Sequence, residues 1–187
     1  MPSFEFETER LLLRQPQRHD APFIVKLIGD YDVAKNLARV PHPYSQKDAD
    51  EFFTVLEEKN AKGTDFVFAV IEKSRGWFMG CAGVHLRDKG EFELGYWLGK
   101  PYWKQGYASE AAKRLAEFSF HDLKAPKLIA GWFHDNPASG HVLAKLGFLP
   151  CGVEQRDSRS RGHAVYCNMV ELPREKFGKQ RKQAEAA

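Results

Sequence analysis

The stretch YWLGKPYWKQGYASEAAKRLAEF, residues 96–118, changes character halfway along its length. An apolar, strand-like beginning is followed by a turn marked by Gly99, Pro101 and Gly106, and then by a pattern typical of a helix. Backbone N–H groups at the start of a helix lack intrahelical partners, and the helix dipole adds partial positive charge there. A glycine at that point permits a tight turn and leaves room for an anion. The stretch therefore predicts either a plain strand-to-helix connection or a phosphate cradle.

Two other phosphate-binding patterns are excluded by the residues of this turn. A dinucleotide-binding fingerprint needs G-x-G-x-x-G, whereas Gly106 is followed by Tyr107, Ala108 and Ser109. A P-loop needs G-K-[ST], which does not occur here.

The composition is that of one globular domain. The chain has 187 residues, of which 43% are hydrophobic and 28% charged, and a net charge of +3, which is too small to indicate a nucleic-acid partner. Three cysteines without C-x-x-C spacing predict neither a disulfide framework nor a zinc site, and we expect reduced thiols in a cytoplasmic protein. No stretch approaches the roughly 18 apolar residues of a membrane span. We expect a single domain at 1–175, a flexible charged tail at 176–187, and no membrane, metal or specific nucleic-acid partner.

Hydrophobic periodicity on either side of the turn predicts an α/β (α+β) domain. Strands are expected at 10–15, 65–72, 77–86, 91–98, 127–134, 151–157 and 164–172. Helices are expected from Asp20, with Pro22 in the first turn, and at 45–60, 109–123 and 136–147, with Ser45 and Asp48 forming a capping box. A crossover helix between two strands returns the second strand parallel to the first. The prediction is a mixed, mostly antiparallel sheet of about seven strands, flanked by about four helices.

Three motifs in a fixed order carry a family resemblance. TERLLLR (8–14), ELGYWLGKPYWKQGYASEA (93–111) and NPASGHVLAKLGF (136–148) together resemble the GNAT N-acetyltransferase superfamily, specifically its RimJ/RimL-like, ribosomal-protein N-acetyltransferase branch. The resemblance covers roughly residues 8–172. It implies the GNAT fold, a sheet splayed between its fourth and fifth strands with acetyl-coenzyme A in the gap.

The resemblance also implies which residues hold the cosubstrate. The family's pyrophosphate turn falls on residues 103–108, with Trp103 where many members have Gln or Arg. Its cradle would be the backbone N–H groups of Lys104, Gln105, Gly106, Tyr107, Ala108 and Ser109. The pantetheine arm would pair with backbone groups of Trp97 and Leu98, and would contact Asn136 and Ser139. Helix capping alone would also explain Asn136.

Acetyl transfer to an amine requires a proton acceptor, because an amine is an ammonium below a pKa near 10. Strand alternation places Glu93 on one face with Glu91, Gly95 and Trp97. A buried carboxylate is either paired with a cation or functional. The family's acid on this strand favours Glu93 as the general base.

The leaving thiolate needs less help, since its pKa of about 8.5 resembles that of cysteine. Many relatives place a tyrosine where this chain has Leu143. We expect Ser139 to donate a hydrogen bond to the sulfur, with Tyr166 or His134 as substitutes.

Other conspicuous side chains are interpreted more simply. We expect His134 and His141 to be solvated or hydrogen-bonded rather than metal ligands. Arg156, Arg159 and Arg161 predict a solvated hairpin loop, although in this family that loop lies near the acceptor, where an acidic acceptor or ribosomal RNA can use it. The aromatic side chains expected in the core or the acceptor-pocket wall are Phe52, Phe53, Trp77 and Phe78.

The resulting hypothesis is an acetyl-coenzyme A-dependent N-acetyltransferase that works by direct attack in a ternary complex, as a monomer or homodimer. The acceptor is left open between a protein N-terminal amine, including that of a ribosomal protein, a polyamine, an amino acid and an antibiotic amine. The alternative is a non-catalytic acyl-coenzyme A-binding or ribosome-associated module.

Overall fold

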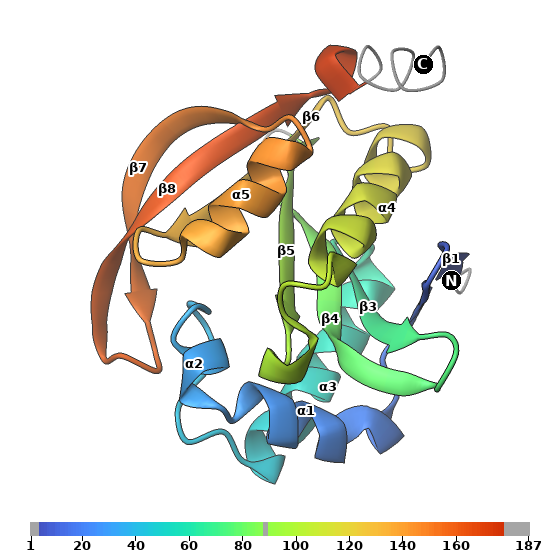
Figure 1. The fold of residues 1–187 in the computed structure, drawn as a ribbon, viewed down its shortest axis with the longest axis vertical. Helices are drawn as coiled ribbons and strands as arrows, with labels where there is room; N and C mark the ends of the chain where they lie inside the picture. The colour runs from blue at the N-terminus through green and yellow to red at the C-terminus, as the bar shows by residue number, and fades with distance from the viewer. Residues whose placement is uncertain (1–3, 88–89, 178–187) are drawn as a thin grey trace.

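A computed structural model, which describes residues 4–87 and 90–177, contains one eight-stranded sheet with helices on both faces (Figure 1). The strand order is β1-β2-β3-β4-β5-β6-β8-β7, and every neighbouring pair is antiparallel except β5 and β6. The strands are β1 (Phe6–Glu7), β2 (Leu11–Arg14), β3 (Asp65–Glu72), β4 (Trp77–Leu86), β5 (Phe92–Leu98), β6 (Lys127–Phe133), β7 (Leu149–Ser158) and β8 (His163–Pro173). The α-helices are α1 (Ala21–Ile28), α2 (Tyr31–Ala34), α3 (Gln46–Lys62), α4 (Tyr107–His121) and α5 (Pro137–Lys145). The predicted mixed, mostly antiparallel sheet is confirmed.

The central strands are buried on both faces because alternate residues pack into different clusters. On β3, Phe68 and Val70 join the core that contains the apolar side of α4. Ala69 and Ile71 point the other way, into the core that α1 and α3 complete. Two helical layers therefore hold the middle of the sheet rigid, which fixes the strand ends from which the site is built.

Helix starts follow the local sequence closely. Ser45 caps α3, and Ser45 and Asp48 form the predicted capping box. Asn136 caps α5 by accepting a hydrogen bond from the Ser139 N–H. Asp20 precedes α1 as expected, but its carboxylate caps no helical N–H and instead binds the Arg14 guanidinium through both oxygens, at 2.7 and 2.8 Å.

Three features differ from the sequence-based expectation. The short strand β1 and the short helix α2 were not expected. Helix α4 begins at Tyr107, directly after Gly106, rather than at Ser109. The chain also stays packed beyond the predicted boundary at 175, because Phe177 is buried with its ring 5.0 Å from that of Phe120. The rest of the predicted tail, residues 178–187, lies outside the described residues.

The sheet is splayed where β5 meets β6, as the resemblance implied. The two parallel strands pair only through Phe92 with Leu128 and Glu93 with Ile129. Beyond Glu93, β5 keeps its antiparallel partner β4 and diverges from β6. Glu93 therefore stands at the point where the gap opens.

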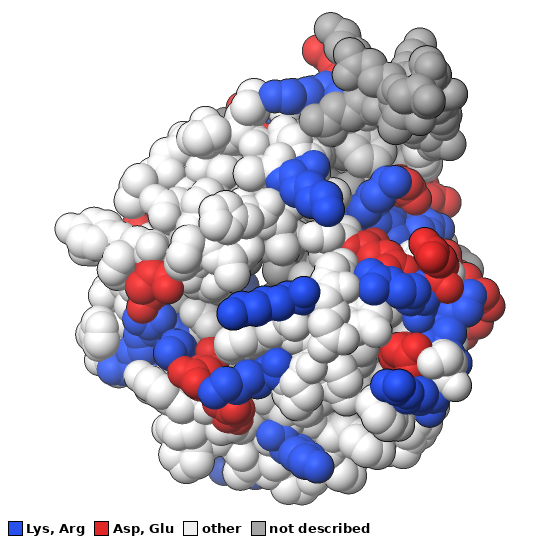
Figure 2. Space-filling model, in the orientation of Figure 1, with Lys and Arg blue, Asp and Glu red and all other residues white. Residues whose placement is uncertain are grey.

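Charged side chains of both signs are interspersed on the side of the molecule near β1 in Figure 2, and they also gather where the lower end of the β7–β8 hairpin approaches α2. The surface at the upper left of that view, over α5 and the adjoining part of the hairpin, is largely uncharged. None of the helices in the described ranges has the length and apolar character needed to cross a bilayer.

One buried acid gives a pH-dependent contribution to stability. Burial acts to raise the pKa of Asp65, but the neighbouring His85 and Lys59 lower it from 3.8 to about 2. A carboxyl whose pKa is lowered on folding stabilises the protein above its unfolded-state pKa and loses this effect as the pH falls through the folded-state pKa. We therefore expect Asp65→Asn to reduce the free energy of unfolding by about 2 kcal/mol at neutral pH, a deficit that shrinks between about pH 4 and pH 2.

Urea unfolding across that pH range, beside the exposed control Asp50→Asn, measures the effect. A deficit that stays constant with pH would contradict the assigned cause.

Candidate active site

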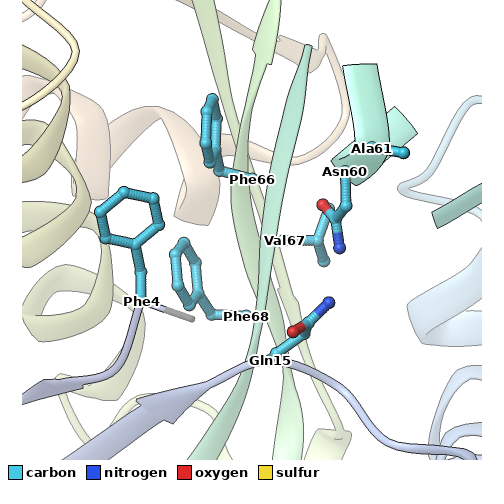
Figure 3. A pocket seen from close by; sticks show the side chains of 7 residues that line it. All are labelled: Phe4, Gln15, Asn60, Ala61, Phe66, Val67 and Phe68. Carbon is cyan, nitrogen blue, oxygen red and sulfur yellow. The ribbon is translucent and has the colours of Figure 1, made fainter. Parts of the chain in front are cut away.

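A cavity with a volume of about 500 Å³ lies in the splayed gap. It is lined by the diverging part of β5, the first turn of α4, the facing end of β6, the start of α5, and segment 33–38, which begins in α2. A smaller cavity, about 270 Å³, lies against β3 (Figure 3). Phe4, Phe66 and Phe68 gather on one side of that strand, and the lining contains only apolar side chains and the amides of Gln15 and Asn60. Of these two cavities, the larger one brings ionisable groups and a helix N-terminus together.

The turn before α4 has the geometry of an anion cradle. Gly106 is the N-cap of α4 with φ of 83°, and Lys104 also has a positive φ of 60°. In the described part of the chain, the backbone N–H groups of residues 104–109 donate to no hydrogen-bond acceptor. The turn contributes Lys104 and the first residues of α4 to the cavity lining. Free N–H groups beside a glycine at a helix N-terminus fit a pyrophosphate.

Two side chains of the turn fold back and fix its shape. The Trp103 Nε1–H donates to the Leu98 carbonyl at 2.7 Å, so the residue that replaces the family's Gln or Arg ties the turn to the end of β5. The Gln105 amide donates to the Pro101 carbonyl at 2.8 Å. The free N–H groups are therefore held in place by the chain itself.

The N-terminal motif TERLLLR braces the same turn from outside. Arg10 donates through Nη1 to the Gln105 carbonyl at 3.0 Å and through Nε to Glu110 at 2.7 Å. Thr8 donates its hydroxyl to the other oxygen of Glu110 at 2.6 Å, and the Arg10 guanidinium lies over the Tyr107 ring. These contacts join the segment directly before β2 to the first turn of α4, and sequence reasoning assigned none of them.

Glu93 is buried at the opening of the gap, and cations hold both of its oxygens. Oε1 lies 2.5 Å from Arg156 Nη1, and Oε2 accepts from Arg87 Nε at 2.7 Å. Burial acts to raise the pKa of Glu93, but Arg156 and Arg87 lower it below the ordinary value. The cation pairing that the sequence left open as one role for Glu93 is therefore present, and the carboxylate also lines the cavity.

Ser139 lies across the cavity in the first turn of α5. Its hydroxyl is 2.9 Å from the phenol oxygen of Tyr96, and the Tyr96 hydroxyl also donates to the Ser139 carbonyl at 3.1 Å. Burial raises the pKa of Tyr96 to about 12, so the phenol stays neutral and holds its proton. Tyr96 was not predicted as a site residue, because strand alternation only placed it on the apolar face of β5.

The predicted cavity residues are largely brought together. Those that line it are Glu93, Trp97, Leu98, Lys104, Gly106, Tyr107, Ala108, Ser109, Asn136 and Ser139, whereas Gln105 is not among them. Leu143 lines the cavity where relatives carry a tyrosine. Of the substitutes considered for that tyrosine, Tyr166 and His134 are exposed and neither is among the lining residues.

The β7–β8 hairpin is not the solvated loop that its arginines predicted. Arg156 is half-buried against Glu93, and Arg161 binds both oxygens of Asp135, at 2.7 and 3.0 Å. The hairpin tip also reaches the segment that follows α2, because the Arg159 N–H donates to the Ala38 carbonyl at 3.0 Å. Figure 1 shows the hairpin arching toward α2. The hairpin therefore closes one side of the cavity.

Of the four aromatic residues expected in the core or pocket wall, three pack inside. Phe53 and Phe78 are buried, and Phe52 packs against the same cluster. Trp77 is wrong as a core prediction, because it is about half exposed and lies under the Arg75 guanidinium.

The family follows from comparison with known proteins. The family described as acetyltransferase (GNAT) domain matches residues 10–149, and the chain therefore belongs to it. A similar relative is "Uncharacterized N-acetyltransferase p20" from Bacillus licheniformis, 26% identical over 172 residues that cover 91% of this chain and 96% of the relative. The chain is thus a GNAT acetyltransferase, and acetyltransferases of this family use acetyl-coenzyme A.

Two solved structures show the same fold. The ribosomal-protein-S5-alanine acetyltransferase from Vibrio fischeri superposes with a TM-score of 0.79 at 19% identity, covering 93% of this chain and 98% of the other. The spermidine N-acetyltransferase from Vibrio cholerae, in complex with coenzyme A and spermine, gives a TM-score of 0.77 at 18% identity, covering 91% and 99%. The membership of the GNAT superfamily that the resemblance implied is confirmed by the family match, and these structures share its fold.

Proposed function

We propose that the protein transfers the acetyl group of acetyl-coenzyme A to a primary amine, with donor and acceptor bound together. The observation that carries the proposal is one cavity with free N–H groups of a helix N-terminus at one side and a buried carboxylate at the other. The bound donor supplies an activated acyl thioester. The backbone N–H groups of residues 104–109 bind its pyrophosphate, and β5 beyond Glu93 offers backbone groups at Trp97 and Leu98 to the pantetheine arm.

Glu93 is proposed as the group that takes up the proton from the acceptor. It is the carboxylate of the described cavity lining, and it stands where the gap begins to open. Its lowered pKa keeps it ionised and able to attract an ammonium, at the cost of weaker basicity. Transfer of the proton completes as the nitrogen forms its bond to the acyl carbon and the carbon–sulfur bond breaks.

Ser139 is proposed to donate a hydrogen bond to the departing sulfur. Its hydroxyl is positioned by Tyr96, whose own pKa of about 12 makes the phenol a poor proton donor toward a thiolate. Because coenzyme A is an adequate leaving group without full protonation, a hydrogen bond is sufficient.

Ser139→Ala is therefore expected to slow turnover by no more than about a hundredfold, the low end of general-acid effects. Coenzyme A affinity, measured by calorimetry, is expected to stay close to that of the wild type. A larger loss of turnover with binding intact would show that the sulfur needs a true proton donor.

The decisive experiment for the proposed function is thiol release from acetyl-coenzyme A with a panel of amines, beside calorimetric titration with coenzyme A. Turnover with at least one amine is expected. Binding of coenzyme A without turnover on any amine would favour the non-catalytic module.

A further inference from the structure

The charges of the cavity limit which amine it can accept. Among the described residues that line it, Glu93 is the only one with a carboxylate, and Arg156 and Arg87 already neutralise it. A polyamine carries several ammonium groups, and burying each one needs an anionic partner. The described cavity lining has no further carboxylate to pair with the additional ammonium groups of a polyamine.

The Arg156 guanidinium has a nitrogen without a strong hydrogen-bond acceptor in the described chain. Its Nε pairs with Glu154 and its Nη1 with Glu93. Its Nη2 has only the Met169 sulfur, at 3.5 Å, as a partner in the described chain. A thioether is a weak acceptor, so this half-buried nitrogen is poorly satisfied. The two terminal nitrogens together form the fork that binds a carboxylate through two parallel hydrogen bonds.

On this basis we propose that the acceptor is a small amino acid-like molecule, with its carboxylate bound by Arg156 and its ammonium by Glu93. This inference rests on the proposed acetyl transfer and names the substrate class of the same site. The incoming carboxylate accepts hydrogen bonds from Nη1 and Nη2 of Arg156. Glu93 Oε1, which loses Arg156 Nη1 as its partner, then accepts a hydrogen bond from the incoming ammonium. Every charge stays paired in this arrangement. At Glu93, the ammonium whose proton the carboxylate must accept replaces the Arg156 guanidinium, and Arg87 stays in place.

The spacing of the pair limits the distance between the two groups of the acceptor. Arg156 and Glu93 are in direct contact, at 2.5 Å, so the amine and the carboxylate must lie close together, as they do on one carbon of an α-amino acid. A molecule that separates them by a long chain cannot satisfy both partners.

Closure of the cavity favours a small acceptor over a polypeptide. The hairpin tip is hydrogen-bonded to the end of α2 and to the segment after it, where residues 159, 160 and 161 meet the carbonyls of Ala38, Ala34 and Lys35. A peptide chain leaving on that side would have to break these bonds. A free amino acid has no chain that must leave on that side.

The test compares each of a set of α-amino acids with its own α-amide, together with spermidine and short N-terminal peptides, in the thiol-release assay. The free acids are expected to exceed their amides in kcat/KM by about tenfold or more, because each charge-assisted hydrogen bond is stronger than a neutral one. Spermidine and peptides are expected to be poor acceptors.

Two substitutions connect the preference to Arg156. Arg156→Gln is expected to bring the acid-to-amide ratio close to one while coenzyme A affinity is kept, and Arg156→Lys, which keeps the charge without the fork, is expected to be intermediate. The matched control is Glu154→Gln, which removes the Arg156 partner outside the cavity lining and should leave the ratio unchanged. If Arg156→Gln fails to fold, the wild-type ratio and Arg156→Lys still decide.

The outcomes separate the two proposals. Amides or spermidine accepted as well as the free acids, or peptides preferred to both, would overturn the amino acid assignment and leave acetyl transfer standing. Coenzyme A binding with no turnover on any amine would overturn both.

Discussion

Glu93→Gln is expected to keep coenzyme A affinity and to lose roughly 10² to 10⁴ in turnover, because the amide preserves shape but cannot accept the proton of the ammonium. The same change leaves the half-buried Arg156 and the exposed Arg87 facing a neutral group. Breaking a fully buried ion pair typically costs about 3–5 kcal/mol. Both guanidinium groups reach solvent here, so the loss should be smaller, but the melting temperature should still fall. Turnover is therefore expressed per folded molecule, with calorimetry and thermal unfolding on the same sample.

Glu91→Gln is the matched control. Glu91 directly precedes β5 and pairs with Lys127 at 3.2 Å, but it is not part of the described cavity lining. The Glu93 variant should also recover activity as the pH rises toward the pKa of the acceptor, since free amine then forms without help. A destabilised Glu93 variant with near-normal turnover per folded molecule would leave the residue a purely structural role.

Gly106→Val is expected to weaken coenzyme A binding by about a hundredfold or more while the fold survives. The residue has φ of 83°, which a β-branched side chain adopts only with strain, and a Cβ there would lie 3.3 Å from Arg10 Nη2. The substitution thus disturbs both the cradle and its brace. Calorimetric titration with coenzyme A measures the loss.

Gly76→Val separates strain from binding. Gly76 has a similar φ of 68°, in the β3–β4 turn, and a Cβ there would meet nothing within 4 Å. Both variants should lose a comparable amount of stability, and only Gly106→Val should lose affinity. Equal affinity in a folded Gly106 variant would remove the anion cradle from the proposed function.

Much of the fold was predictable because its signals are local. The capping box at Ser45 and Asp48 and the cap at Asn136 each involve residues a few positions apart, and the structure contains both. Alternation along β5 correctly placed Leu94 and Trp97 on opposite faces of the sheet, where they pack against different core clusters, because successive side chains of a strand point to opposite sides. The short elements β1 and α2 were missed because two- and four-residue segments are too brief to show a period.

The environment of the site was not predictable in the same way. Three arginines between two strands look like a solvated turn until their partners are known, and the partners of Arg156 and Arg161 lie 63 and 26 positions earlier in the chain. The pairing of Tyr96 with Ser139 likewise spans 43 positions and the splayed gap. Such contacts depend on the three-dimensional path of the splayed sheet, which a local sequence pattern does not predict. For this reason the sequence left the role of Glu93 open between ion pair and base.

The brace between Thr8, Arg10 and Glu110 makes the proposed ligand site depend on a segment a hundred residues away in the chain. During synthesis, the segment TERLLLR emerges before the residues of α4 are made. The turn before α4 therefore reaches its final shape only when Thr8 and Arg10 contact Glu110. By mass action, a ligand that binds the braced turn also stabilises the docked strand β2. Coenzyme A should therefore slow amide hydrogen exchange in β2, which does not line the cavity, and displacement of Thr8 and Arg10 by a fusion or by proteolytic trimming should weaken its binding.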